Sequence, residues 1–74
     1  MRRGRIEMKA AILTDLLDRP LGASRLAGMA GMNYANCMAL LSELRQQGMI
    51  TRVENKYQIT EAGAAALAHA MELA

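Results

Sequence analysis

The sequence contains no tryptophan and no phenylalanine, and its only aromatic residues are two tyrosines. A folded core must therefore be filled by leucine, isoleucine, alanine and some of the seven methionines, whose flexible side chains adapt to irregular spaces. Hydrophobic residues still make up 53% of the chain, a proportion that argues against disorder. A chain of 74 residues is long enough for one small domain with a thin core. We expect residues 1–74 to form a single domain.

Cysteine and histidine are almost absent, which restricts the chemistry that the chain can perform. Cys37 is the only cysteine, so an internal disulfide and a cysteine-rich metal site are excluded, and a reducing cytoplasmic setting is favoured. His69 has no carboxylate or cysteine at ligand spacing in its alanine-rich segment, and a metal site needs several ligands. We therefore predict a protein that is not an enzyme and that has no metal, cofactor or small-molecule ligand.

Long apolar runs are also missing. No stretch approaches the roughly 20 apolar residues that span a bilayer, and the basic start, residues 1–5, is not followed by the apolar run of a secretory signal. The formal net charge is +2, and the sequence pI is about 9.1. This mild basicity permits binding to nucleic acid without requiring it. We expect a cytoplasmic protein without a membrane partner.

The strongest local pattern lies between Asn33 and Gly48. Asn33 can cap a helix start, and Gly48 tolerates the left-handed turn that follows a helix end. Apolar residues recur between them at helical steps of three and four: Tyr34, Cys37, Leu40, Leu41 and Leu44. A shorter apolar segment, residues 26–29, precedes a glycine-containing break. The pattern predicts a helix-turn-helix in which the second helix, residues 33–47, enters a DNA groove.

A first helix is predicted from about residue 4 to residue 19. Its inner stripe is expected to contain Ile6, Ala10, Leu13, Leu16 and Leu17. Met8 and Ile12 fall outside this stripe and form a second apolar edge. Pro20 and Gly22 should end the helix, and Ser24 is expected to cap a short helix that runs from Arg25 to about Ala30.

Two β-prone runs, residues 49–53 and 56–60, flank a turn that contains Asn55, and together they predict a β-hairpin. Ile50, Tyr57 and Ile59 are the expected buried side chains. A hairpin that follows a helix-turn-helix is a wing, here predicted over residues 50–60. Arg52 and Lys56 place positive charge near its tip.

A final helix, about residues 61–74, is predicted from its alanine content and from Thr60, which can cap it. Its apolar residues cannot all face one core, because Leu67 and Leu73 are separated by about 240° on a helix. We therefore predict a homodimer joined by this helix and by the second edge of the first helix. The expected interface residues are Met8, Ile12, Leu67, Met71 and Leu73.

The order helix, helix, helix, hairpin, helix carries a family resemblance. It rests on RGRIE (residues 3–7), RPLGASRL (19–26), NY (33–34), LLSELRQQGMI (40–50) and YQITEAG (57–63). The chain resembles the winged helix-turn-helix domains of small archaeal-type transcriptional regulators, which are related to DNA-binding proteins with a C-terminal dimerisation helix. The resemblance implies an α+β, mainly α, fold and a DNA-binding role in transcription regulation.

The chain departs from this family in the helix of residues 33–47. Recognition helices of such domains commonly carry lysine or arginine on their exposed face, whereas here Ala35, Asn36, Met38 and Ala39 occupy it. The predicted base contacts are Asn36, Ala35 and Ala39, since asparagine can bond adenine. The last helix is also too short for a long zipper, because 14 residues give only about 21 Å.

The predicted phosphate contacts are the basic residues of the N-terminus, the helix-turn-helix and the wing: Arg2, Arg3, Arg5, Arg25, Arg52 and Lys56. For the N-terminal arginines a solvated tail is an equal alternative, and a solvated surface position is an alternative for Arg25. A second function also remains open, in which the uncharged helix packs on a partner protein and the domain does not bind DNA. The basic wing and N-terminus favour DNA.

Overall fold

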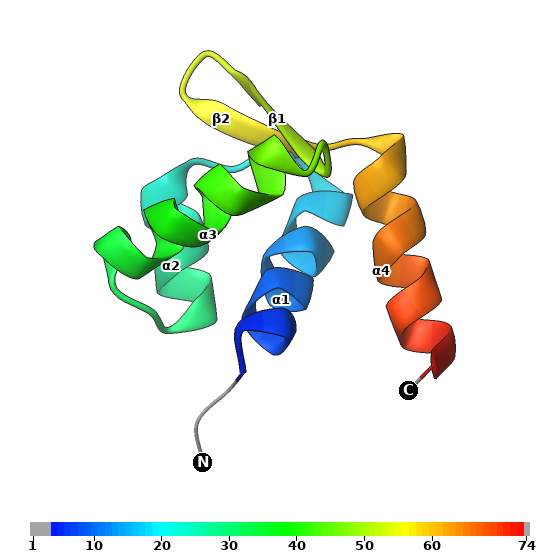
Figure 1. The fold of residues 1–74 in the computed structure, drawn as a ribbon. Coiled ribbons are helices and arrows are strands. Elements are labelled where there is room, and N and C mark those ends of the chain that lie inside the picture. Colours follow the sequence, from blue (N-terminus) through cyan, green and yellow to red (C-terminus); the bar gives the residue numbers. More distant parts are fainter. Residues whose placement is uncertain (1–3, 74) are drawn as a thin grey trace.

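The computed structural model describes the backbone of residues 4–73 and the side chains of residues 4–69. Its elements follow the predicted order: α1 (Arg5–Asp18), α2 (Ala23–Ala30), α3 (Tyr34–Gln46), β1 (Ile50–Val53), β2 (Lys56–Ile59) and α4 (Glu61–Leu73). In Figure 1, α1 lies in the middle, with α2 and α3 on one side, α4 on the other and the hairpin across one end. This arrangement confirms the predicted winged helix-turn-helix fold, which is α+β and mainly α.

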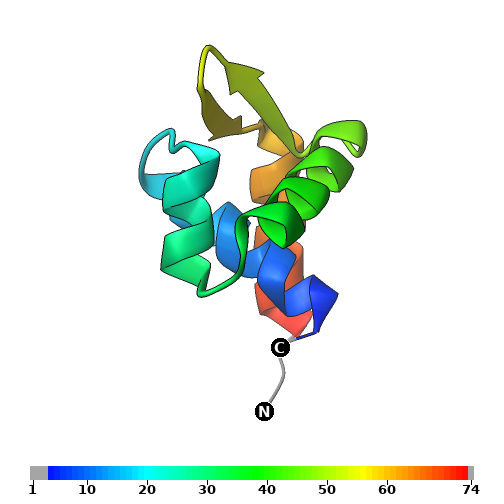
Figure 2. The same ribbon diagram turned by 90° about the vertical axis from the view of Figure 1, so that its left-hand side faces the viewer.

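The two helices of the helix-turn-helix are joined by a glycine turn. Gly31 ends α2 in the left-handed conformation, with φ of 67°, and Gly48 turns the chain after α3 with φ of 75°. Asn33 begins α3 as predicted, because its side-chain oxygen accepts a hydrogen bond of 2.8 Å from the backbone N–H of Asn36. In Figure 2, α2 lies to the left, and α3, inclined to it, lies in front of part of α1.

The predicted cap of α2 is wrong. The helix begins at Ala23, its N-cap residue is Gly22, and Ser24 does not cap it. The reason is a contact with the wing: Leu21 and Tyr57 form a β-bridge, with N–H···O distances of 3.2 and 2.8 Å. This bridge keeps Leu21 extended, so the helix can start directly after Gly22.

The core lies where α1, α2, α3 and β2 meet. Its fully buried side chains are Ile12, Leu26, Cys37, Leu41 and Leu44. Cys37 is a small buried residue, as predicted. Its thiol lies 3.7 Å from the carbonyl oxygen of Ala23 in α2, and burial raises the pKa of the thiol.

The predicted orientation of α1 is partly wrong. Ile12, expected on an outer edge and in a dimer interface, is completely buried, whereas Ile6 and Leu17 of the expected inner stripe are 79% and 53% exposed. The helix packs against α2, β2 and α4 at once, so its buried face is centred on Ile12, Leu13 and Leu16. Met8 is half-buried and packs on the same core.

The wing is a two-stranded antiparallel hairpin in which Ile50 pairs with Ile59 and Arg52 pairs with Tyr57. Ile50 and Tyr57 are buried, as predicted, and Ile59 is half-buried. The turn differs from the expectation in one residue. Glu54, and not Asn55, adopts the left-handed conformation, with φ of 59°.

Helix α4 begins against the end of α3. The Thr60 hydroxyl accepts a hydrogen bond of 3.1 Å from the N–H of Gly63, which confirms the predicted cap, and donates one of 2.6 Å to the carbonyl of Gly48. Gly63 has no room for a side chain, because a Cβ atom there would lie 2.1 Å from the carbonyl oxygen of Met49. These contacts fix where α4 leaves the wing.

Leu67 of α4, which was predicted in a dimer interface, is 5% exposed and belongs to the core of a single copy. It lies one helical turn after Gly63 on the side of α4 that faces α1. The side chains of Met71 and Leu73 lie outside the described part, as do Arg2 and Arg3.

Within residues 4–73, no helix is long and apolar enough to cross a membrane.

Candidate nucleic-acid interface

The outer face of α3 carries short, uncharged side chains. Ala35, Asn36 and Ala39 are exposed, and Ser42 and Gln46 continue the same face toward the C-terminus. The three residues predicted to contact bases therefore lie on the accessible surface of the helix. Small side chains allow the helix backbone to approach a flat surface or a groove closely.

A hollow of about 440 Å³ lies between α2, α3 and the wing. Its walls carry Arg25 at the start of α2, Tyr34 and Met38 of α3, and Arg52 and Asn55 of the hairpin. Two of the predicted phosphate-binding arginines thus come together from elements that are 27 residues apart in the sequence. We call this hollow the wing-side groove.

Tyr34 was predicted on the inner face of α3 but is 55% exposed. The buried face of the helix is centred on Cys37, Leu40, Leu41 and Leu44, and Tyr34 lies at its margin in the first turn. Its ring is consequently available at the rim of the wing-side groove.

The arginine of the wing is held by its own turn. The Arg52 Nε atom donates a hydrogen bond of 3.0 Å to the carbonyl of Glu54, and the residue is exposed. Lys56 does not line the wing-side groove. It shares a smaller hollow of about 190 Å³ with Arg25 and Arg19, so Arg25 lies between two groups of basic residues. Arg19 was not predicted as a contact, since nothing in its local sequence distinguishes it from a solvated helix end.

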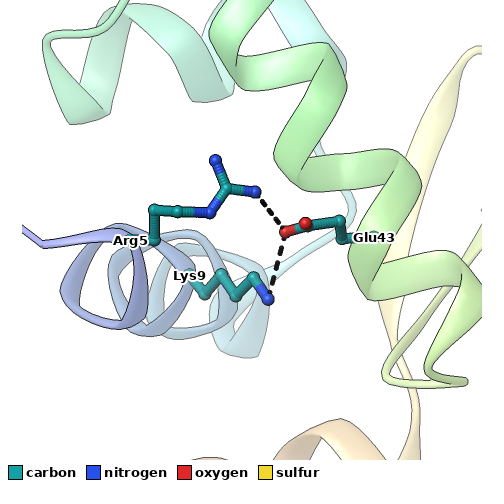
Figure 3. A network of polar contacts seen from close by, with 3 residues as sticks. All are labelled: Arg5, Lys9 and Glu43. Atoms are coloured by element: carbon teal, nitrogen blue, oxygen red, sulfur yellow. Dashed lines mark ion pairs between the residues drawn. The ribbon is translucent and has the colours of Figure 1, made fainter.

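The opposite side of α3 carries an ion-pair cluster, which Figure 3 shows. One oxygen of the Glu43 carboxylate, Oε2, lies 2.5 Å from the Arg5 guanidinium and 3.1 Å from the Lys9 ammonium. The Arg5 guanidinium, followed by Lys9, lowers the pKa of the Glu43 carboxyl group by hydrogen bonding to it. Arg5, predicted to meet phosphate, is therefore paired within the domain. Neither Glu43 nor Lys9 was predicted, because their partners are distant in sequence.

Arg5 also lines a hollow of about 210 Å³ between α1 and α3, together with Met8, Asn36, Ala39 and Leu40. The outer face of α3 is thus flanked by basic residues on both sides. On the wing side they are Arg25 and Arg52, and on the α1 side Arg5 and Lys9 surround a single carboxylate. In the part of the chain whose side chains are described, no three histidine, cysteine, aspartate or glutamate residues are grouped to hold a metal ion.

Comparison with known proteins places the fold in a family. The sequence matches the winged helix-turn-helix family over residues 2–74, which is nearly the whole chain. The chain therefore belongs to the winged helix-turn-helix family, as the resemblance predicted.

The solved structures that are similar to this one include two different proteins. Sso10a-2, a DNA-binding protein from Sulfolobus solfataricus, is 29% identical, with a TM-score of 0.79, over 96% of this chain and 78% of that chain. PigF with SAH is 22% identical, with a TM-score of 0.72, over 85% of this chain. That match covers only 19% of the PigF chain, and it shows the fold alone. No curated protein matches the sequence.

Proposed function

We propose that this protein is a non-enzymatic, cytoplasmic regulator of transcription that binds duplex DNA through α3 and the wing. The observation that carries the proposal is the meeting of Arg25 and Arg52 in one groove beside the outer face of α3. In helix-turn-helix proteins the second helix lies in the major groove while the first crosses the backbone. The similarity to Sso10a-2, a DNA-binding protein, supports the same role.

In this proposal the basic residues hold the backbone and the short side chains of α3 meet the bases. Arg25, Arg52 and Lys56 contact phosphates, and Arg2 and Arg3 add contacts from the N-terminus. Asn36 donates to and accepts from a base edge, while the methyl groups of Ala35 and Ala39 make apolar contacts of the kind that suit thymine. Because phosphate contacts carry no sequence information, most of the affinity is independent of sequence.

A salt titration of binding to duplex DNA tests the proposal. Each phosphate neutralised contributes about 0.9 to the slope of log K against log salt concentration. Arg25→Ala and Arg52→Ala should each reduce the slope by about this amount for each bound subunit. Thr14→Glu is the charge-matched control, because it also lowers the net charge by one but lies on the exposed face of α1. Absence of salt-dependent binding by the native protein at low ionic strength would contradict the proposal.

One observation supports a second candidate function, that of a protein-interaction module. Tyr34 and Met29, at the two sides of the turn between α2 and α3, are 55% and 54% exposed. Exposed apolar side chains of this size, beside the uncharged outer face of α3, are of the kind that a partner protein covers. If the native protein does not bind DNA in the titration, the result would favour the interaction module over the DNA-binding regulator.

We further propose that residues 1–74 form one domain and that α4 joins two copies into a homodimer. Because Ile12 and Leu67 are buried, we place the proposed interface near the N-terminal end of α1. There the exposed Ile6 lines an apolar hollow of about 210 Å³ with Ala66, Leu67 and neighbouring residues. A two-fold contact over this hollow would cover Ile6 and would space two copies of α3 for successive major grooves, roughly 34 Å apart.

Sedimentation equilibrium tests the dimer. The native chain should associate at hundreds of micromolar, and Ile6→Glu should shift it to monomer. Leu17→Glu makes the same chemical change at the other end of α1, at another exposed position, and should leave association unchanged. A native chain that stays monomeric would refute the dimer without touching the proposed binding to DNA.

A further inference from the structure

We propose that Arg5 exchanges its partner when DNA binds: Glu43 holds it in the free domain, a DNA phosphate takes it in the complex, and Lys9 remains on Glu43. The inference rests on the proposed function and adds a contact on the α1 side of α3. It makes Glu43 a competitor of DNA for the same arginine.

The geometry of the cluster supports an exchange because a single carboxylate oxygen serves two basic residues. Glu43 Oε2 contacts both the Arg5 guanidinium and the Lys9 ammonium (Figure 3). When Arg5 leaves, Glu43 is still paired with Lys9, so no carboxylate is left without a counter-charge. A cluster with a single cation would lose its only pair in the same movement.

The two basic residues differ in accessibility, which decides which one leaves. The Arg5 side chain is 64% exposed, whereas that of Lys9 is 22% exposed. Exposed ion pairs are weak, since water and salt screen them and holding two long side chains costs entropy. Arg5 is thus the residue that a phosphate can reach and remove, and its planar guanidinium suits bidentate contact with phosphate oxygens.

The released side chain has a place to go. Arg5 already lines the hollow between α1 and α3 together with Asn36 and Ala39, two of the residues proposed to meet bases. A DNA backbone that follows the groove around α3 passes this side after it has contacted the outer face. The contact would oppose those of Arg25 and Arg52 across α3, so the duplex would be held on both sides of the helix.

The test compares salt titrations of duplex DNA binding for the native chain and three variants. Arg5→Gln should lower the slope by about 0.9 for each bound subunit, which reduces the ratio of affinities at 50 and 200 mM salt about 3.5-fold per subunit. Lys9→Gln is the matched control, because it removes the same charge from the same helix and the same carboxylate. It should leave the slope unchanged, since Lys9 does not reach phosphate.

The third variant is Glu43→Gln, which removes the competitor. It should tighten binding about two- to fivefold at every salt concentration, the range that corresponds to loss of an exposed ion pair, and should keep the native slope. Glu7→Gln, an exposed carboxylate on α1, makes the same charge change and should have a smaller effect. Far-UV circular dichroism and thermal melting confirm that each variant is folded.

Two results would overturn the exchange. Equal slopes for Arg5→Gln and Lys9→Gln would mean that Arg5 does not reach phosphate. A slope that steepens in Glu43→Gln would mean that Arg5 stays on Glu43 in the native complex. Both differ from failure of the proposed function, in which the native chain itself shows no salt-dependent binding and this inference falls with it.

Discussion

Replacing glycine with alanine at two helical positions tests the packing of α4. The substitution is expected to increase the free energy of unfolding at one position and to decrease it at the other. Gly63 lies in the first turn of α4 and Gly28 in α2, and both have helical backbone conformations. At Gly63 a Cβ atom would lie 2.1 Å from the Met49 carbonyl oxygen and 2.9 Å from the Ile59 side chain. At Gly28 nothing lies within 4 Å of the added atom.

The magnitudes follow from these contacts. Alanine in place of glycine in a helix interior is favourable by about 0.5–1 kcal/mol. At Gly28 this term acts alone, so Gly28→Ala should increase the free energy of unfolding by about that amount. At Gly63 the added methyl group meets a backbone oxygen that cannot rotate away, and α4 must move from the wing. Overpacking of this kind costs about 1–3 kcal/mol, so Gly63→Ala should be destabilising by about 0.5–2 kcal/mol after the helix term is subtracted.

Thermal and urea unfolding measure both variants against the native chain. For a domain of this size, 1 kcal/mol corresponds to a change in Tm of about 4–8 °C. Gly28→Ala should therefore raise Tm by several degrees, and Gly63→Ala should lower it by a similar or larger amount. Equal stabilisation by the two substitutions would refute the close approach of α4 to Met49, and with it the position of α4 beside α1.

Three further predictions follow from the caps and the ion-pair cluster. Asn33→Ala removes the side chain that accepts from the Asn36 N–H and should lower the free energy of unfolding by about 1 kcal/mol in urea titrations; a change below a few tenths would contradict the cap. Thr60→Val removes both the bond from Gly63 and the bond to Gly48, and the same titrations should show a loss of about 1–2 kcal/mol, larger than for Asn33→Ala. Because the pKa of Glu43 is lowered below its ordinary value of 4.5 in the folded domain, its stabilising effect is present above that value and is lost as the pH falls through the folded pKa. Stability measured between neutral and acidic pH should thus fall less steeply for Glu43→Gln than for the native chain, and identical curves would exclude a contribution from the cluster.

The elements that were predicted correctly are those whose signals are local. Asn33 caps a helix whose first N–H groups lie three residues away, and Thr60 does the same for α4, so the sequence alone contains both partners of each bond. The register of the hairpin follows for the same reason, because a two-residue turn fixes which residues face each other. Gly48 could likewise be placed after α3, since a helix end needs a residue that accepts positive φ.

The predictions that were wrong depend on contacts between distant segments. Ser24 has a good capping side chain, but the bridge between Leu21 and Tyr57 starts the helix two residues earlier than that cap requires. The periodicity of α1 shows two apolar edges without saying which of them is covered, and packing against α2, β2 and α4 selected the one that contains Ile12. Apolar residues at steps of three and four therefore predict that a helix is present more reliably than they predict which of its faces is buried.

In the candidate site, too, local features could be predicted from the sequence and contacts between distant segments could not. The accessibility of Ala35, Asn36 and Ala39 could be derived from the periodicity of α3, because the opposite face is apolar. The pairing of Glu43 with Arg5 and Lys9 could not, since it joins residues more than 30 positions apart and depends on how α1 and α3 are placed. Counting basic residues in the sequence included Arg5 among the phosphate contacts without revealing the carboxylate that competes for it.

This arrangement of charge has a consequence for specificity under the proposed function. Each good bidentate contact to a base edge contributes about 1–3 kcal/mol of discrimination, and on the outer face of α3 Asn36 is the side chain best suited to one. One such contact distinguishes the preferred base by roughly 5- to 150-fold at one position, whereas the basic residues on both sides of α3 bind any duplex. Sequence preference measured on randomised duplexes should therefore be narrow in extent and centred on adenine. Asn36→Ala should abolish that preference and leave the slope of the salt titration unchanged, because Asn36 neutralises no phosphate. A variant that loses affinity for all sequences equally would show instead that Asn36 positions the helix and does not read a base.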